Sequence, residues 1–363
     1  MPLNPEQTID LLLRGAGLGL LSLLALRLLQ PPRSANRLLC LGLGLCIGGY
    51  LITSGGFDSQ MPLLLRLPQL MLATLAPAMF WLFAQALFND ELRWHWLHAL
   101  PPLLLGAMPL AWLLSLGDPD TRKGLELSQH LLASLLMIHV LWLTWRDHRS
   151  DLLPQRRVLR LWLGPGIGLY ILTVLTVEVI HPAGDVPGWL SLLNLLGIFL
   201  VTLWLSLRLE DLLELLAPAH SKKTRVNASS IFNLAAENQT EKEKDSSDQP
   251  ALQRLHMAMQ DEQLWRRETL SVTELAKHLG LAEYRLRRLI NGALGQRNFN
   301  SYLNQFRISA ACEQLADPAR RRLPILSIAL DVGFASIGPF NRAFKAQLGI
   351  TPSEFRREKL GES

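Results

Sequence analysis

The sequence predicts an all-helical protein with two parts, a membrane bundle of seven helices and a basic domain that holds two helix-turn-helix units. Hydrophobic residues make up 49% of the chain and charged residues only 18%, below the ~25% that is usual for soluble domains. Residues 251–363 hold 17 Lys and Arg against 11 Asp and Glu, whereas residues 1–250 hold 19 against 20, so the last third carries the net positive charge. We therefore expect a membrane domain at 1–210, a flexible linker at 211–250 and a soluble domain at 251–363.

Seven apolar stretches are long enough to cross a bilayer, which takes ~20 residues of helix. They lie at about residues 9–29, 37–54, 62–88, 94–116, 127–146, 158–180 and 188–208. The second is the shortest, and its glycines favour close packing against neighbouring helices. The segment before the first stretch lacks the basic residues of a cleavable signal, so we expect that stretch to be a membrane helix.

Basic residues are distributed unevenly between the expected connections, and they orient the bundle because Lys and Arg stay on the cytoplasmic side. One set of connections holds Arg27, Arg33, Arg37, Arg93, Arg146, Arg149, Arg156, Arg157, Arg160, Arg208, Lys222, Lys223 and Arg225. The opposite set holds Arg66, Arg122 and Lys123. The pattern predicts a multi-pass membrane protein whose N-terminus is outside and whose C-terminal domain is in the cytoplasm.

Polar side chains within the expected spans are candidates for a signal-sensing site, because ionisable groups at membrane depth are costly. Arg66, His130 and Glu178 are all expected near the outer leaflet, and Asn194 adds a further polar group. They could line one cavity in which Arg66 pairs with Glu178; alternatively, these two side chains extend to the membrane interface from the ends of their spans. His139, near the middle of its span, is expected to bind a neighbouring helix by a hydrogen bond rather than to bind a ligand.

The expected linker is polar, mixed in charge and poor in aromatic side chains. Such a composition buries too little apolar surface to fold by itself. Opposite charges three and four positions apart at 241–245 are compatible with a brief helix, which does not change the prediction.

The first helix-turn-helix unit is predicted from Ser271 onward. Ser271 and Glu274 have the spacing of a capping box, in which each side chain binds a backbone amide at the start of a helix. The small Ala276 and the break at Gly280 are typical of two helices that cross closely.

The second helix of this unit presents an outward face that is basic and aromatic. Its members are Tyr284, Arg285, Arg287 and Arg288. Arginine can bind guanine through two hydrogen bonds, and Tyr or Arg can hold a phosphate. The alternative is a solvated basic face, but the turn before the helix favours contact with DNA.

A second unit with the same layout follows about fifty residues later. Residues 324–332 predict an apolar helix, Gly333 turns the chain, and Ser336 caps the next helix. The candidates for DNA contact here are Ser336, Ile337, Asn341, Arg342 and Lys345. Residues 299–316 predict one long helix between the units, a rigid spacer that sets the two recognition helices ~34 Å apart along DNA.

The stretch LPILSIALDVGFASIGPFNRAFKAQLGITPSEFRR at residues 323–357 resembles the signature of AraC/XylS-type transcriptional regulators. The resemblance covers about residues 251–358. It implies a two-motif DNA-binding domain that acts in the control of bacterial transcription, with double-stranded promoter DNA and RNA polymerase as partners. It places base contacts at Tyr284, Arg287 and Arg288 in the first unit, and at Ile337, Gly338, Asn341 and Arg342 in the second.

The second recognition helix departs from that family's pattern. Family members commonly have polar side chains where this chain has Ile337, Gly338 and Pro339, so fewer hydrogen bonds to bases are available. We therefore predict that the first unit carries most of the sequence discrimination, while Ile337 contacts a thymine methyl group.

These observations favour a regulator of the bacterial cytoplasmic (inner) membrane, whose spans sense an unknown small-molecule or membrane-protein signal and control the tethered DNA-binding domain. A homodimer through the spans is compatible with this hypothesis. The alternatives are a transporter-like protein and a passive membrane anchor that carries a DNA-binding domain. The sequence lacks a P-loop, an HExxH zinc motif and a nucleophile elbow, so we expect the protein to have no enzymatic activity and no cofactor. Its three cysteines form no CxxC metal motif.

Overall fold

The computed structural model describes residues 5–31, 34–54, 61–89, 92, 94–114, 118–146, 150–160, 164–180, 187–208, 213 and 237–361. The chain divides into two compact units, one formed by residues 1–146 with 158–221 and the other by residues 147–157 with 222–363. Throughout the described residues the regular structure is helical, apart from one isolated antiparallel bridge between Asp151 and Asn298.

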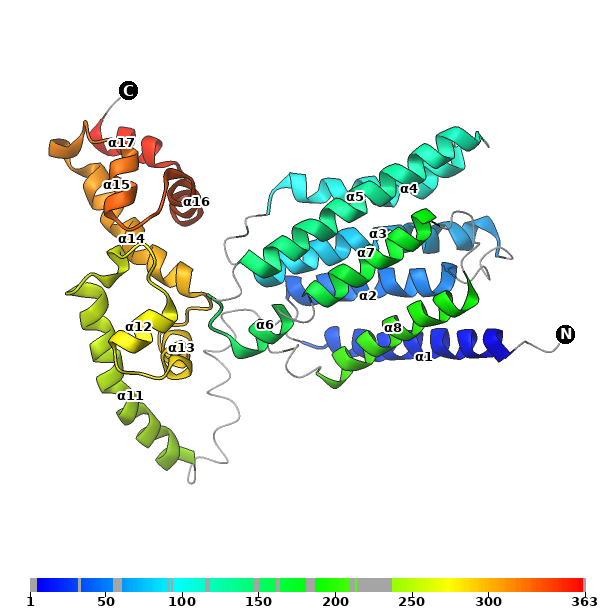
Figure 1. The fold of residues 1–363 in the computed structure, drawn as a ribbon, viewed down its shortest axis with the longest axis horizontal. Helices are drawn as coiled ribbons and strands as arrows, with labels where there is room; N and C mark the ends of the chain where they lie inside the picture. The colour runs from blue at the N-terminus through cyan, green and yellow to red at the C-terminus, as the bar shows by residue number, and fades with distance from the viewer. Residues whose placement is uncertain are drawn as a thin grey trace. The chain divides into compact units, whose positions relative to one another are not determined.

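The first unit is a bundle of apolar helices. Its elements are α1 (Pro5–Leu28), α2 (Ala35–Thr53), α3 (Leu63–Phe88), the 3₁₀ turn η2 (Trp96–Ala99), α4 (Leu100–Leu114), α5 (Pro119–Arg146), α7 (Gly164–Ile180) and α8 (Gly188–Leu207). Figure 1 shows these helices lying roughly along one direction. Neighbours in the bundle include the pairs α2 with α3, α5 with α7, and α1 with α8.

Six helical segments in the described part of the chain are long and apolar enough to cross a membrane. The helix at the sixth expected span is shorter, because α7 has 17 residues and so measures about 25 Å, against a hydrocarbon core of about 30 Å. The seven predicted spans therefore correspond to six segments of spanning length and one shorter apolar helix.

The exterior of this bundle is apolar. Leucines such as Leu12, Leu64, Leu103 and Leu135 are exposed, Leu64 to 85% of its surface. A water-soluble domain seldom exposes so extensive an apolar surface.

Polar side chains inside the bundle are bound to other helices. The guanidinium of Arg14 is buried, pairs with Asp10 at 2.7 Å and donates to Ser54 Oγ at 2.9 Å. Trp81 Nε1 donates to His139 Nδ1 at 2.7 Å, joining α3 to α5. The interhelical hydrogen bond predicted for His139 is thereby confirmed.

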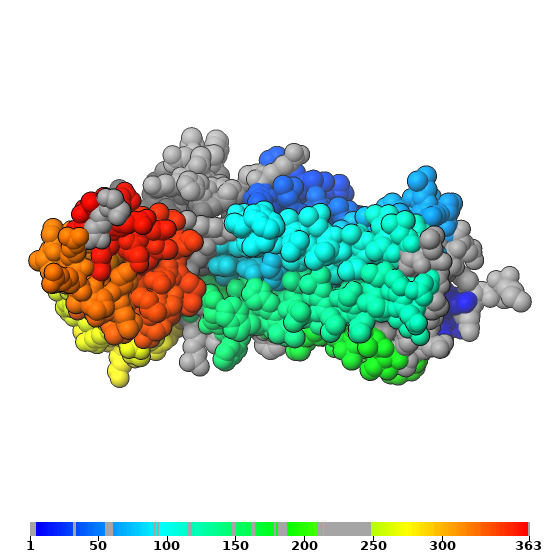
Figure 2. All heavy atoms as spheres, turned by 90° about the horizontal axis from the view of Figure 1, so that it is seen from above, coloured from blue at the N-terminus to red at the C-terminus, as the bar shows by residue number. Residues whose placement is uncertain are grey.

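The second unit is a domain of short helices. It contains most of α6 (Pro154–Val158), α11 (Glu237–Gln260), η6 (Leu264–Arg266), α12 (Val272–His278), α13 (Glu283–Gly292), α14 (Phe299–Ala316), η7 (Pro318–Arg320), α15 (Ile325–Asp331), α16 (Ile337–Leu348) and α17 (Pro352–Leu360). The helix α11 begins inside the segment that the composition predicts as a linker. Figure 2 shows the helices coloured orange to red, α14 to α17, as one continuous surface.

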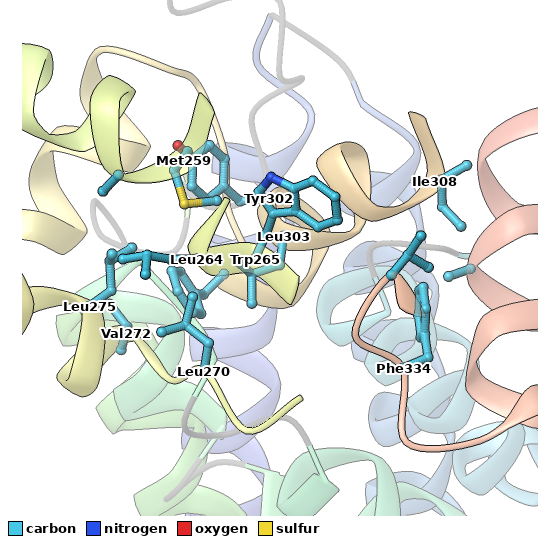
Figure 3. Packing of buried hydrophobic residues seen from close by; sticks show 14 of the residues in the cluster. Met259, Leu264, Trp265, Leu270, Val272, Leu275, Tyr302, Leu303, Ile308 and Phe334 are labelled. Carbon is cyan, nitrogen blue, oxygen red and sulfur yellow. The ribbon is translucent and has the colours of Figure 1, made fainter. Parts of the chain in front are cut away.

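The long helix α14 has the core of the domain on both of its sides. In Figure 3, Met259 lies next to Tyr302, and Val272 and Leu275 lie on the same side of the view, whereas Ile308 and Phe334 lie on the opposite side. All belong to one buried hydrophobic cluster. The predicted spacer helix at 299–316 is confirmed, and it acts as the wall against which both helix-turn-helix units pack.

A buried arginine on α14 fixes the segment before the first unit, and no pattern in the sequence indicated it. Arg307 Nε donates to the carbonyl of Trp265 at 2.7 Å, and its Nη2 donates to the carbonyl of Arg267 at 2.8 Å. Its guanidinium also lies 5.4 Å from the ring centre of Phe334, which belongs to the second unit. Burial lowers the pKa of Arg307 to about 10, so the side chain remains a cation at neutral pH.

Candidate nucleic-acid interface

The two helix-turn-helix units share one turn geometry. In the first, the amide of Leu281 donates to the carbonyl of Ala276 at 2.9 Å, and Gly280 has a φ of +64°. In the second, the amide of Phe334 donates to the carbonyl of Ala329 at 2.9 Å. A hydrogen bond from an amide to the carbonyl five residues earlier, across a left-handed glycine, is the Schellman ending of a helix. It directs the chain into the recognition helix in the same way in both units.

The glycine of the second turn is also required by close packing. Gly333 has a φ of +88°, and a Cβ atom built there would lie 2.6 Å from the carbonyl oxygen of Arg266. The first turn is open by comparison, since the nearest atom to a Cβ at Gly280 is Arg254 Nη1 at 3.9 Å.

The sequence predicts caps at the starts of α12 and α16, and the two helix starts differ in their hydrogen bonds. The amide of Glu274 donates to Ser271 Oγ at 3.2 Å, and the amide of Ser271 donates to Glu274 Oε2 at 2.8 Å, which confirms the capping box. Ser336 stands at the N-cap of α16, but its side chain makes no capping hydrogen bond. The predicted N-cap position of Ser336 is therefore confirmed, although the helix starts there without a hydrogen bond from an amide to the Ser336 hydroxyl.

A second capping box, between Thr351 and Glu354 at the start of α17, was missed in the sequence. The amide of Glu354 donates to Thr351 Oγ1 at 3.2 Å, and the amide of Thr351 donates to Glu354 Oε2 at 2.6 Å. The Thr-x-x-Glu spacing was a usable signal for it.

On the first recognition helix, α13, the four predicted contact residues differ in accessibility. Tyr284 is 73% exposed and Arg288 is also exposed. Arg285 Nη2 binds Asp248 Oδ1 of α11 at 3.1 Å, and Arg288 Nη2 lies 3.5 Å from the other oxygen of the same carboxylate. One carboxylate thus contacts two of the candidate arginines, and a net positive charge remains on the three side chains.

Arg287 is buried, with 7% of its surface exposed. Its Nη2 lies 2.8 Å from Glu283 Oε1, and its Nη1 donates to the backbone carbonyl of Asp151 at 2.6 Å. The structure therefore places this predicted base-reading side chain against other parts of the same unit. The Thr273 hydroxyl, which donates to Glu283 at 2.7 Å, and then Arg287 hold the pKa of Glu283 below its ordinary value, so this carboxylate is ionised at neutral pH.

On the second recognition helix, α16, the predicted contact residues are accessible. Ser336, Ile337, Asn341, Arg342 and Lys345 are all exposed. Arg342 Nη1 lies 3.6 Å from the position that a Cβ would take at Gly338, an ordinary van der Waals separation, so the guanidinium lies beside the first turn of the helix. This face can offer an amide, a guanidinium and an ammonium group to DNA.

The candidates for a signal-sensing site belong to four helices of the bundle, α3, α5, α7 and α8. Arg66 is half-buried in α3, and His130 on α5 has its Nδ1 2.6 Å from the carbonyl of Glu126 in the same helix. The side chain of Glu178 lies outside the described residues, so its pairing with Arg66 stays a prediction. Asn194 Nδ2 donates to the hydroxyl of Tyr50 at 2.8 Å.

Asn194 belongs to a polar junction of three helices. Besides its bond to Tyr50 of α2, its backbone carbonyl accepts from the hydroxyl of Tyr170 of α7 at 3.0 Å. This arrangement gives the Asn194 side chain a packing role within the bundle.

Comparison with known proteins gives matches for the C-terminal domain. A family model described as a helix-turn-helix domain matches residues 275–358. Over 89 residues the chain is 32% identical to the regulatory protein SoxS of Escherichia coli strain K12, a match that covers 24% of this chain and 79% of SoxS. It is 33% identical over 92 residues to the HTH-type transcriptional activator AarP of Providencia stuartii, which covers 25% of this chain and 65% of AarP. No solved structure matches the chain.

Proposed function

Because this chain belongs to the AraC family of DNA-binding transcriptional regulators, we propose that it controls transcription from the membrane and binds promoter DNA through α13 and α16. The proposal rests on one observation above all, namely that two helix-turn-helix units with the same turn pack against one helix, α14. SoxS and AarP are named as regulators, not as enzymes. Promoter DNA and RNA polymerase are accordingly the partners that we propose.

The charge of the domain supports this function. Residues 251–363 carry 17 basic against 11 acidic side chains, and a positive surface attracts the phosphate backbone with an affinity that falls as salt is added. The rigid attachment of both units to α14 supports recognition of two successive half-sites about one helical turn of DNA apart.

We propose that the first unit is embedded in the bilayer. Its exposed leucines and its six segments of spanning length support this, as does the bias of basic residues toward one set of connections. Single-cysteine labelling from either side of inverted vesicles tests the orientation. Labels at Leu64 and Leu348 should be accessible from opposite sides, and accessibility of both from one side would contradict the proposed topology.

DNA recognition is tested with the full-length chain in lipid nanodiscs and a pool of random-sequence duplexes. We expect recovery of a motif with two half-sites about 10 base pairs apart. The variant Arg342→Ala should weaken binding to the recovered duplex, whereas Arg357→Ala on the exposed face of α17 serves as a control of equal charge. Recovery of no common motif, together with equal effects of the two variants, would refute sequence-specific recognition.

We propose that the bundle senses a signal through polar side chains of its helices. Arg66, His130, Glu178 and Asn194 remain the candidates, and Asn194 is already engaged between helices. Replacement of Arg66 and Glu178 by alanine in cells that carry a reporter promoter separates a sensor from a tether. An unchanged response with intact membrane insertion would show that the two side chains take no part in sensing.

A further inference from the structure

A segment that lies between two bundle helices in the sequence is built into the DNA-binding unit. We name Ser150–Leu153 the strap; it follows α5 and precedes α7 along the chain, yet it belongs to the second unit. The amide of Leu152 donates to the carbonyl of Arg297 at 3.0 Å, and the amide of Phe299 donates to the carbonyl of Ser150 at 2.8 Å. These two bonds flank the Asp151–Asn298 pair and define an antiparallel bridge.

The strap is fixed by side chains as well as by its backbone. Leu152 is 2% exposed and is part of the hydrophobic core of the domain. Asn298 Nδ2 donates to Ser150 Oγ at 3.2 Å, and the buried carboxylate of Asp151 lies 3.4 Å from Arg156 Nε. The ion pair lies within the strap's own segment, whereas the apolar anchor, the two backbone bonds and the hydrogen bond from Asn298 join the strap to the rest of the domain and distinguish a built docking site from an incidental contact.

The docked strap binds a side chain of the first recognition helix, α13. The carbonyl of Asp151 accepts from Arg287 at 2.6 Å, and residue 287 lies one turn beyond Tyr284, on the same face of α13. A guanidinium that is buried and bound in this way has its donors committed, so it cannot form a two-bond contact with guanine. DNA recognition by Arg287 and docking of the strap therefore compete for one side chain.

We propose that the strap is an intramolecular latch: docked, it withholds Arg287 from DNA, and displacement of α5 or α7 releases it. This inference rests on the proposed function. Three residues separate Arg146, the last residue of α5, from Ser150, and the four Cα–Cα steps between them span at most about 14 Å at full extension. A link this short transmits a movement of the helix end to the strap instead of absorbing it.

The first test removes the apolar anchor. In the full-length chain in nanodiscs, Leu152→Asp should tighten binding of the duplex recovered by selection by about fivefold, if the docked state holds about nine tenths of the molecules and the Arg287 contact is worth about tenfold. Leu153→Asp is the matched control, because Leu153 is only partly buried and lies outside the core cluster, and it should leave affinity unchanged. Unchanged or weaker binding by Leu152→Asp would overturn the latch.

The second test locks the strap, so that it does not depend on how well Leu152→Asp folds. A non-hydrogen-bonded antiparallel pair places its Cα atoms about 4.5 Å apart, within the range for a disulfide. Asp151→Cys with Asn298→Cys, in a chain whose Cys40, Cys46 and Cys312 are replaced by Ser, should cross-link under oxidation and lose affinity for the duplex. Reduction of the same sample should restore it.

The outcomes separate the latch from the function on which it rests. Failure to cross-link, or equal affinity of the oxidised and reduced forms, would overturn the latch while leaving DNA binding intact. Absence of binding by every form, the wild type included, would instead refute the proposed function.

Discussion

The two helix-turn-helix units are built alike but present their recognition helices differently. Each ends its first helix on the same five-residue hydrogen bond and packs against α14. On α13, however, three arginines are bound to Asp248, Glu283 or the carbonyl of Asp151, whereas Asn341, Arg342 and Lys345 of α16 are exposed. The difference teaches that a common motif fixes the position of a helix, while neighbouring segments decide whether its face is available.

The largest difference between the units should appear in their turns. Gly333→Ala should destabilise the domain by about 3 kcal/mol or more, because backbone strain and steric overlap each cost about 1–3 kcal/mol and the new Cβ meets the carbonyl of Arg266. Gly280→Ala should cost about 1–2 kcal/mol from the left-handed backbone alone. Hydrogen exchange of residues 325–348 in the full-length chain measures the effect of the first variant, and exchange of residues 272–292 that of the second. Equal losses would show that the packing around the two turns is equivalent.

The availability of the two recognition helices should be visible in DNA binding. Arg342→Ala should weaken binding about tenfold, since one good contact of arginine with guanine is worth about 1–3 kcal/mol. Arg287→Ala should have an effect below about twofold in the wild-type background but about tenfold in the Leu152→Asp background, where the strap no longer competes. The affinity of the recovered duplex is measured for wild type, Arg342→Ala, Arg287→Ala, Leu152→Asp and the double variant with Leu152→Asp and Arg287→Ala. The ratios of these affinities give the effect of each arginine. A tenfold loss for Arg287→Ala alone would mean that the strap does not withhold this side chain.

Asp248 on α11 should affect the affinity for DNA less than these arginines do. Asp248→Asn removes the partner of Arg285 and Arg288, and we expect about twofold tighter binding to random-sequence duplex DNA, because partly exposed ion pairs are worth at most about 1 kcal/mol. The gain should vanish as salt is raised. The control is Asp261→Asn, which removes an exposed acid just beyond the end of α11. If Asp261→Asn raised the affinity by the same factor, the effect of Asp248→Asn would come from the change in net charge and not from release of Arg285 and Arg288.

The smallest expected effect is on the pH dependence of the stability of α13. The pKa of Glu283 is lower in the folded chain than its ordinary value of 4.5, so its contribution to stability is present above about pH 4.5 and is lost as pH falls through the lowered pKa. Wild type should therefore be more stable than Glu283→Gln at pH 7, and the difference should shrink below pH 4.5. Hydrogen exchange of residues 283–292 at the two pH values checks this, and a difference that grows on acidification would contradict the assignment.

Much of the architecture could be predicted because its signals are local. The capping box at Ser271 and the spacer helix at 299–316 follow from spacing along a few turns of chain, and the structure confirms both. Arg307 gave no such signal, since its partners Trp265 and Arg267 are distant in the sequence. Its role depends on which carbonyls the folded chain brings to α14.

The sequence by itself determined the helical class, the apolar N-terminal half and the two recognition helices, because hydrophobic period, turn glycines and charge are properties of neighbouring residues. The arginines near 146–160 indicated only a cytoplasmic connection. Tertiary structure alone decided that Ser150–Leu153 of that connection pairs with residues 297–299 and binds Arg287. The reason is physical: a backbone bridge uses groups that every residue carries, so its partner is selected by the folded chain and leaves no mark in the sequence.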